Sequence, residues 1–353
     1  MMQKQDAYGF GIIGLGSIAK THAEALLHAK GCRLVSGYHA NKEKATAFCS
    51  HFGAKGYDDL EAFLSDPALD VVLIATPSGS HLESALASIA HKKHVLIEKP
   101  LEVTVERCDQ LISAAQREQV VLGSIFQSRS YGAAKAIKKA LEEGRFGQLT
   151  LLDAQIKWYR SQAYYDSAAW RGTWQYDGGG ILMNQGIHAI DLLQWFGGPV
   201  SEIYGATATL THERIEVEDT AVATLRFANG ALGVIEGTTG TYPGFLKRIE
   251  VCGSQGSAIL EEDSLLTWKF REERIEDELI RTQFSKEHGS KVDATQSSGL
   301  DFAGHQGVFE DFVQALRENR DPTISGKEAR KPVEIIEAIY ASARGRVPVS
   351  LPL

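Results

Sequence analysis

The sequence predicts an α/β domain followed by an α+β domain with an open, mostly antiparallel sheet. Up to about residue 125, short apolar runs alternate with amphipathic stretches, as expected for a parallel sheet with helical crossovers. Beyond that point, longer alternating runs and the turn signal Asn229-Gly230 indicate β-hairpins. A chain of 353 residues also suits two cores better than one. We therefore expect domains at 1–125 and 126–353.

The elements of the first domain follow from its apolar periodicity. Residues 70–75 form a nearly continuous apolar run, which is typical of a strand buried on both faces. Further strands are expected at 10–13, 33–37, 94–97 and 120–125, and helices at 17–29, 42–52, 81–91 and 104–118.

The second domain has longer strands and fewer helices. Residues 271–298 are polar and charged, and we expect an irregular excursion or lid there. The expected strands are 149–159, 221–227, 231–236, 245–252, 257–260 and 265–270, and the expected helices are 132–143, 180–196, 308–318 and 328–344.

The composition argues against nucleic-acid and membrane partners. The net charge of −8 supplies no basic face for a phosphate backbone. No apolar run is long enough to span a bilayer or to serve as a signal peptide, so we expect a cytoplasmic protein. No pair of the four cysteines shows metal-ligand spacing, and we expect reduced, mostly buried thiols.

A glycine-rich turn predicts dinucleotide binding. Gly14-Leu15-Gly16-Ser17-Ile18-Ala19 fits G-x-G-x-x-A, follows a predicted strand and opens a predicted helix. Gly14 allows the tight turn and Gly16 lets the backbone approach a pyrophosphate. The phosphate would then sit at the helix N-terminus, beside Ser17 and Ile18. The first domain is therefore predicted to be a Rossmann domain that binds NAD or NADP.

The end of the second predicted strand leaves the choice of cofactor open. An acid here accepts the ribose hydroxyls of NAD and repels the 2′-phosphate of NADP. The chain has Tyr38-His39-Ala40-Asn41-Lys42 instead, with no acid. His39, Asn41 and Lys42 could tolerate a phosphate, or they could be solvated loop residues.

Three further stretches indicate a family. They are Ala75-Thr76-Pro77-Ser78-Gly79-Ser80-His81, Glu98-Lys99-Pro100, and the segment from Gly178 to Asp191, GGGILMNQGIHAID. Together with the glycine turn, in this order, they resemble the Gfo/Idh/MocA family of glucose–fructose oxidoreductase, inositol dehydrogenase and relatives. The resemblance covers nearly the whole chain. It implies a Rossmann domain, a second domain with an open sheet, and hydride transfer between nicotinamide and a sugar, polyol or related carbonyl.

The resemblance assigns roles in the first domain. Thr76 and Pro77 would touch the cofactor, and His81 would either join them or only cap the next helix. Glu98 and Lys99 would also lie at the cofactor, with a cis bond before Pro100. Lys99 matches the active-site lysine of the family, whose ammonium can hydrogen-bond the oxygen of a secondary alcohol.

In the second domain, Asn184, His188 and Asp191 are spaced to share one helical face. Many family members carry an acid at the position of Asn184, but an amide cannot act as a base. His188 is therefore the candidate proton acceptor, and Asn184 would orient the substrate. We expect Asp191 to cap or pair locally, and we expect no metal site, because His188 has no evident further ligands.

The stretch Trp170-Arg171-Gly172-Thr173-Trp174 precedes the glycine run. Arg171 could clamp a phosphate or carboxylate of cofactor or substrate, and the tryptophans could shape the pocket or simply pack the loop. Tyr159 is a further substrate candidate, and Gln127 and Trp170 are further cofactor candidates. The pattern resembles members that act on nucleotide-linked amino-uronic acids at the 3-position of the sugar, which favours NAD slightly.

Two alternatives to a sugar dehydrogenase remain open. One is a non-catalytic NAD(P)-binding sensor, and the other is a relative that uses held NAD for transient oxidation in glycoside cleavage. The presence of both Lys99 and His188 favours an enzyme. The resemblance also predicts a sugar-like small-molecule substrate and a homo-oligomer, dimer or tetramer.

Overall fold

The computed structural model describes residues 7–286 and 302–353, which form two compact units. One unit holds the chain up to Gln127 and the segment that ends at Arg330, and the other begins at Ser128 and includes Lys331–Leu353. Helix α10 (Ala303–Glu318) packs on α1 (Ser17–His28) in the first unit, although the sequence analysis placed it with the residues after 125. Nothing local in the sequence marks this return of the chain to its first unit.

The first unit contains a six-stranded parallel sheet in the order β3-β2-β1-β4-β5-β6. This is the strand order of a dinucleotide-binding Rossmann domain, and it confirms the predicted fold class. The short strand β3 was not predicted, because none of its three residues is buried and it carries no apolar signal. The strands are β1 (Tyr8–Ile13), β2 (Cys32–Tyr38), β3 (Lys55–Tyr57), β4 (Val71–Ile74), β5 (His94–Ile97) and β6 (Leu122–Ser124).

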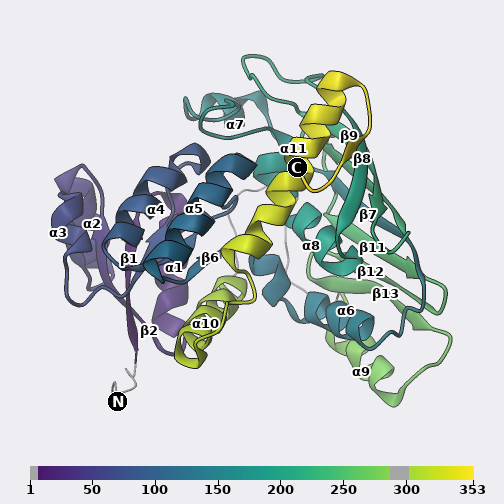
Figure 1. Ribbon diagram of the computed structural model, residues 1–353, viewed down its shortest axis with the longest axis horizontal. Helices are drawn as coiled ribbons and strands as arrows, with labels where there is room; N and C mark the ends of the chain where they lie inside the picture. The colour runs from purple at the N-terminus through teal and green to yellow at the C-terminus, as the bar shows by residue number, and fades with distance from the viewer. Residues whose placement is uncertain (1–6, 287–301) are drawn as a thin grey trace. The chain divides into compact units, whose positions relative to one another are not determined.

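The helices of this unit begin in two different ways. Asn41, Asp59 and Thr104 accept hydrogen bonds from backbone N–H groups at the starts of α2, α3 and α5. Helix α1 instead begins after Gly16, with no side-chain cap. Its first N–H groups are therefore left for another acceptor. The remaining helices are α2 (Lys42–His51), α3 (Leu60–Leu64), α4 (His81–Ala90) and α5 (Val105–Glu118) (Figure 1).

The second unit is built on an eight-stranded sheet in the order β13-β12-β11-β7-β10-β9-β8-β14. Only the pair β7–β10 is parallel, which confirms the predicted open, mostly antiparallel sheet. Strand β8 was not predicted, because its glycine, alanines and polar residues weaken the apolar signal. The strands are β7 (Leu149–Lys157), β8 (Val200–Ala208), β9 (Thr220–Phe227), β10 (Leu232–Thr238), β11 (Arg248–Gly253), β12 (Gly256–Glu261), β13 (Ser264–Phe270) and β14 (Val349–Ser350).

Helix α8 (Ile187–Gly197) packs on β7 and β11, so that alternate residues of β7 are buried. The other helices with residues in this unit are α6 (Gly132–Glu142), α7 (Gln162–Asp166), α9 (Ile275–Gln283) and the C-terminal part of α11 (Gly326–Gly345) (Figure 1). Among the described residues, no helix combines the length and apolar character needed to cross a membrane.

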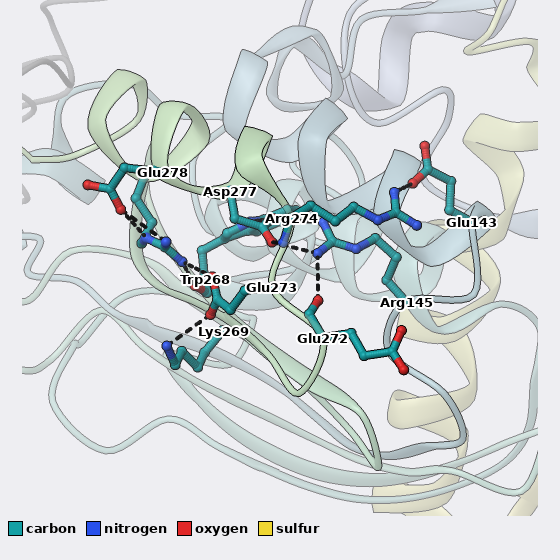
Figure 2. A network of polar contacts seen from close by, with 10 residues as sticks. Glu143, Arg145, Trp268, Lys269, Glu272, Glu273, Arg274, Asp277 and Glu278 are labelled. Atoms are coloured by element: carbon teal, nitrogen blue, oxygen red, sulfur yellow. Dashed lines mark hydrogen bonds and ion pairs between the residues drawn. The ribbon is translucent and has the colours of Figure 1, made fainter.

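The prediction of an irregular excursion at 271–298 is wrong for its first part, which contains α9; residues 287–298 lie outside the described residues. Figure 2 shows why so polar a stretch is ordered: its charges are paired. The carboxylate of Asp277 is buried and accepts hydrogen bonds from Arg145 and from the indole of Trp268, at 2.7 Å each. The pair with Arg145 holds the pKa of Asp277 well below its usual range. Charge pairing thus replaces the apolar face by which the sequence analysis recognised helices.

Candidate functional site

The glycine turn has the geometry that a dinucleotide requires. Gly14 has φ of +91°, and a Cβ there would lie 2.7 Å from the carbonyl of Ala75, so only glycine lets this turn meet the end of β4. A Cβ on Gly16 would meet nothing within 4 Å among the described residues. Ser17 is exposed and Ile18 half-buried at the open helix start. The uncapped N-terminus of α1 beside this open space fits a pyrophosphate.

The loop after β2 is held by its own side chains. Nδ1 of His39 accepts a hydrogen bond from the N–H of Asn41 at 2.9 Å. Asn41 in turn caps α2 by accepting from the N–H of Lys44 at 2.8 Å. The amide of Asn41 is therefore engaged in the fold, while His39 stays half-buried at the end of the strand.

His81 joins two loops that carry several of the predicted cofactor residues. Its ring is buried, with Nδ1 3.0 Å from the carbonyl oxygen of Pro100 and Nε2 3.1 Å from that of Thr76. Burial lowers the pKa of His81, against the opposing charge of Glu102. His81 begins α4, and its ring lies between these two carbonyl oxygens rather than capping the helix. A neutral imidazole has one N–H, so it donates to one of the two. Thr76 and Pro77 themselves lie half-buried at the end of β4.

The bond between Lys99 and Pro100 is cis, as predicted. Glu98 is buried, and its Oε2 accepts a hydrogen bond from the N–H of Lys99 at 3.0 Å. Its Oε1 lies 2.7 Å from Nε2 of His22. Burial alone would raise the pKa of Glu98, but His22, and then His305 and Lys99, hold it at about 2. His22 and His305 were not predicted, because no spacing rule links either histidine to Glu98.

In the second unit, the single helix predicted at 180–196 is wrong. Residues 181–186 form a wider π-helical turn, and α8 begins at Ile187. The spacing argument for one shared face therefore fails for Asn184, which lies in the wide turn. His188 stands half-buried in the first turn of α8.

The partners of this segment also differ from the prediction. Asp191 does not pair locally: it forms a buried ion pair with Arg129, 62 residues away, at 2.6 Å. Nδ2 of Asn184 donates to Oδ1 of Asp177 at 2.5 Å. The other oxygen of Asp177 accepts from the N–H of Gly172 at 2.9 Å. The predicted substrate residue is thus anchored to the loop that carries Arg171.

A buried carboxylate explains why glycine stands at position 180, directly before the wide turn. Glu218 accepts hydrogen bonds from the N–H groups of Gly180 and Leu182 at 3.0 Å and from the hydroxyl of Tyr340 at 2.9 Å. A Cβ on Gly180 would overlap the carbonyl of Glu218, so this approach requires glycine. Burial raises the pKa of Glu218 to about 7, although the hydrogen bonds oppose the shift.

Two arginines flank Tyr164. The guanidinium of Arg171 lies 4.2 Å from the ring centre of Tyr164 and 4.6 Å from that of Trp170, and it donates to the Tyr164 hydroxyl at 2.6 Å. Arg160 lies 5.5 Å from the same Tyr164 ring. Among the described residues Arg171 has no carboxylate partner, and its buried Nε meets no acceptor. Tyr159, the other predicted substrate residue, packs edge-on against Tyr242.

Comparison with known proteins identifies the family. Residues 8–126 match the description "Oxidoreductase family, NAD-binding Rossmann fold", and residues 134–259 match "GFO/IDH/MocA C-terminal domain". The chain belongs to the Gfo/Idh/MocA oxidoreductase family.

Among similar structures are two WlbA dehydrogenases, both in complex with NADH and UDP-GlcNAcA. The protein from Bordetella pertussis is 34% identical, with a TM-score of 0.87 over 98% of each chain. That from Chromobacterium violaceum is 32% identical, with a TM-score of 0.88 over 99% of this chain and 98% of that one. A curated relative, myo-inositol 2-dehydrogenase of Thermotoga maritima, is 27% identical over 91% of both chains.

As a Gfo/Idh/MocA oxidoreductase, the protein is an NAD(P)-dependent dehydrogenase that acts on a secondary alcohol or ketone of a sugar-type molecule. This confirms the predicted family, activity class and cofactor class, and it favours the enzyme over the sensor. When bound, the nicotinamide supplies the acceptor or donor of the hydride. The open helix start at Gly16 and the loops tied together by His81 fit that cofactor. Gln127 begins a short 3₁₀ turn, and its predicted contact with the cofactor stays a prediction.

Proposed function

We propose that the substrate is a nucleotide-linked amino-uronic acid of the UDP-GlcNAcA type, oxidised at the 3-position of its sugar with NAD as the working cofactor. The observation that carries this proposal is the similarity, over nearly the whole chain, to two dehydrogenases whose structures contain NADH and UDP-GlcNAcA. Such a substrate bears a carboxylate and a pyrophosphate, so its site needs cations that the protein does not already neutralise.

Among the described residues Arg171, which stacks on Tyr164 and Trp170, has that property. A guanidinium stacked on aromatic rings keeps its N–H donors directed outward for a planar anion. Burial, and then the charge of Arg171, lower the pKa of Arg160, and an anion bound nearby would offset the crowding of two cations. Because Arg171 has no acidic partner among the described residues, it is the stronger candidate for a contact with cofactor or substrate anions.

The proposed catalytic roles divide between two residues. Lys99 donates a hydrogen bond to the oxygen of the reacting alcohol and stabilises the negative charge that develops there. His188 accepts the hydroxyl proton during oxidation, because imidazole is the side chain suited to proton transfer near neutral pH. Asn184, fixed by Asp177, orients the substrate by hydrogen bonds.

A matched pair of substrates tests the proposal. We would compare UDP-GlcNAcA with UDP-GlcNAc, which has a neutral hydroxymethyl group in place of the carboxylate, using NAD and NADP and the absorbance of the reduced nicotinamide. Oxidation of UDP-GlcNAcA at least tenfold faster, with the preference reduced in Arg171→Gln, is the expected result. Equal rates for both nucleotide sugars, or activity only on a free polyol such as myo-inositol, would refute it.

We also propose that the protein is a homo-oligomer that pairs through the exposed face of its eight-stranded sheet. Leu151 on β7 and Leu232 on β10 are register partners, and both are more than a third exposed. Val222 on β9 and Tyr204 on β8 extend this apolar surface across neighbouring strands. Light scattering of Leu232→Lys should show smaller particles than wild type, whereas Leu210→Lys, at an exposed leucine outside the strands, should not.

A further inference from the structure

A cluster of three buried titratable side chains includes Glu98, which precedes Lys99 in the chain. It consists of His22 on α1, Glu98 after β5 and His305 on α10, and all three belong to the first unit. Less than a tenth of the surface of each is exposed. Burial of an ionised carboxylate is costly unless it is paired, so an arrangement of this kind calls for a function.

The contacts of Glu98 run in two directions. Toward the interior, its Oε1 lies 2.7 Å from Nε2 of His22, and the rings of His22 and His305 meet edge to face with centres 5.1 Å apart. On the other side, its Oε2 accepts a hydrogen bond from the backbone N–H of Lys99 at 3.0 Å. The carboxylate therefore connects a buried histidine pair to the backbone of the proposed catalytic lysine.

The ligating atoms of these three residues all lie within 4.8 Å of one another, which raises the question of a metal ion. Two ligands of one tetrahedral zinc, each about 2.0–2.1 Å from the ion, lie roughly 3.3 Å apart. The atoms of His22 and Glu98 are closer than that, at 2.7 Å. Such a separation suits a direct imidazole–carboxylate contact with no ion between the two groups.

We propose that His22 and His305 are positioning residues that keep the Glu98 carboxylate ionised next to Lys99, and that this carboxylate fixes the Lys99 backbone and favours its ammonium form. The proposal rests on the role of Lys99 proposed above. The charged or titratable groups that act on Glu98 are His22 from α1, His305 from α10 and its neighbour Lys99. The charges of Glu98 and Glu102 act in turn on His81, which holds the carbonyl of Pro100.

The test is the pH dependence of acylation of Lys99 in the full-length protein, measured by mass spectrometry of the peptide that contains it. Acylation requires the free amine, and no turnover is involved, so failure of the proposed reaction would not affect this measurement. Glu98→Gln removes the negative charge beside the ammonium. It should lower the pH at which acylation of Lys99 is half-maximal by roughly half a pH unit to one pH unit. His22→Met should lower it in the same direction, because the carboxylate loses its partner and takes up a proton.

Two further variants separate positioning from simple structural support. His22→Gln keeps an N–H donor at the position of Nε2 and should restore the midpoint toward wild type. His94→Gln, at the other end of β5, replaces a half-buried histidine that accepts the N–H of Val121 and makes no contact with Glu98. It should leave the midpoint unchanged, even if the melting temperature falls.

The expected kinetic result is a decrease of roughly tenfold or more in kcat for His22→Met, with little change in KM and with partial recovery in His22→Gln. Identical acylation midpoints in wild type, Glu98→Gln and His22→Met, with all three folded, would overturn the proposal. A stoichiometric transition metal in the purified wild-type protein, lost in His305→Leu, would overturn it as well, because the cluster would then be a metal site.

Discussion

The two units of the molecule build their functional segments by different means. In the first unit, the glycine turn is shaped by neighbours that the βα pattern itself specifies: Gly14 meets the end of β4, and Gly16 opens α1. In the second unit, the segment that carries Asn184 and His188 is shaped by distant side chains, since Glu218 fixes its start and Arg129 anchors Asp191. A local pattern is therefore sufficient in one unit, whereas the other requires partners that sequence spacing cannot reveal.

The largest effect is expected where the chemistry is proposed to lie in the first unit. Lys99→Ala should reduce turnover by roughly a hundredfold or more, the usual scale for loss of a donor that stabilises developing negative charge. Binding of NADH, followed by nicotinamide fluorescence, should remain close to wild type, because the glycine turn is untouched. Lys92→Ala, which removes an exposed lysine paired with Glu118, is the matched control and should retain activity. Turnover close to wild type in Lys99→Ala would remove this residue from the mechanism.

The second unit supplies the next largest effect, at His188. His188→Gln should lower the oxidation rate by roughly tenfold to a hundredfold and abolish the acid limb that an imidazole base gives to the pH–rate profile. Asn184→Asp should move that limb to higher pH in the wild-type background, because a carboxylate favours imidazolium. The structure limits this shift: the new carboxyl would lie 2.5 Å from Asp177, and the two groups would share a proton.

The outcome that would contradict a proton-accepting role is a folded, nearly fully active His188→Gln enzyme with its acid limb intact. Melting curves of both variants provide the folding control. If the acid limb persists in His188→Gln but shifts in Asn184→Asp, another group near Asn184 accepts the proton.

The same difference between local and distant contacts explains which elements could be predicted from the sequence. The parallel sheet could be predicted because each of its central strands is a compact apolar run, as in Val71–Ile74, and each turn obeys local chemistry. Helix α9 could not, because a paired charge at Asp277 takes the place of an apolar face. The wide turn at 181–186 could not, because hydrogen bonds to Glu218 hold its start, and that residue lies 36 positions beyond Leu182.

The pH dependence of stability should reveal the contribution of Glu218, which holds the start of the wide turn. The folded state raises the pKa of Glu218 from 4.5 to about 7, so between these values it retains a proton that the unfolded chain has lost. The retained proton on Glu218 therefore contributes to the free energy of unfolding fully below pH 4.5, and this contribution declines as the pH rises to about 7. Glu218→Gln has no such titration, and it loses an acceptor for a buried N–H, at a cost of about 1–3 kcal/mol.

Melting temperatures measured from pH 5 to pH 8 test this prediction. The deficit of Glu218→Gln relative to wild type should be largest at pH 5 and should shrink toward pH 7. Glu213→Gln, at an exposed carboxylate in the same loop, should follow wild type throughout. A deficit that grows as the pH rises would show that Glu218 is ionised in the fold and that its hydrogen bonds outweigh its burial.

The smallest effect is expected at the end of β2, where local chemistry leaves cofactor choice open. Because no acid stands there, wild type should discriminate only weakly between NAD and NADP. His39→Asp should shift the ratio of kcat/KM toward NAD by roughly fivefold to tenfold, about the 1 kcal/mol that an exposed pair of charges contributes. An aspartate can accept the N–H of Asn41 that His39 accepts at 2.9 Å, so the loop should keep its form. His39→Asn, which accepts the same N–H without a charge, should leave the ratio of kcat/KM for NAD and NADP near its wild-type value.

A wild-type enzyme that already rejects NADP strongly would mean that a group outside this loop contacts the ribose. The first unit would then depend on a distant partner as the second does.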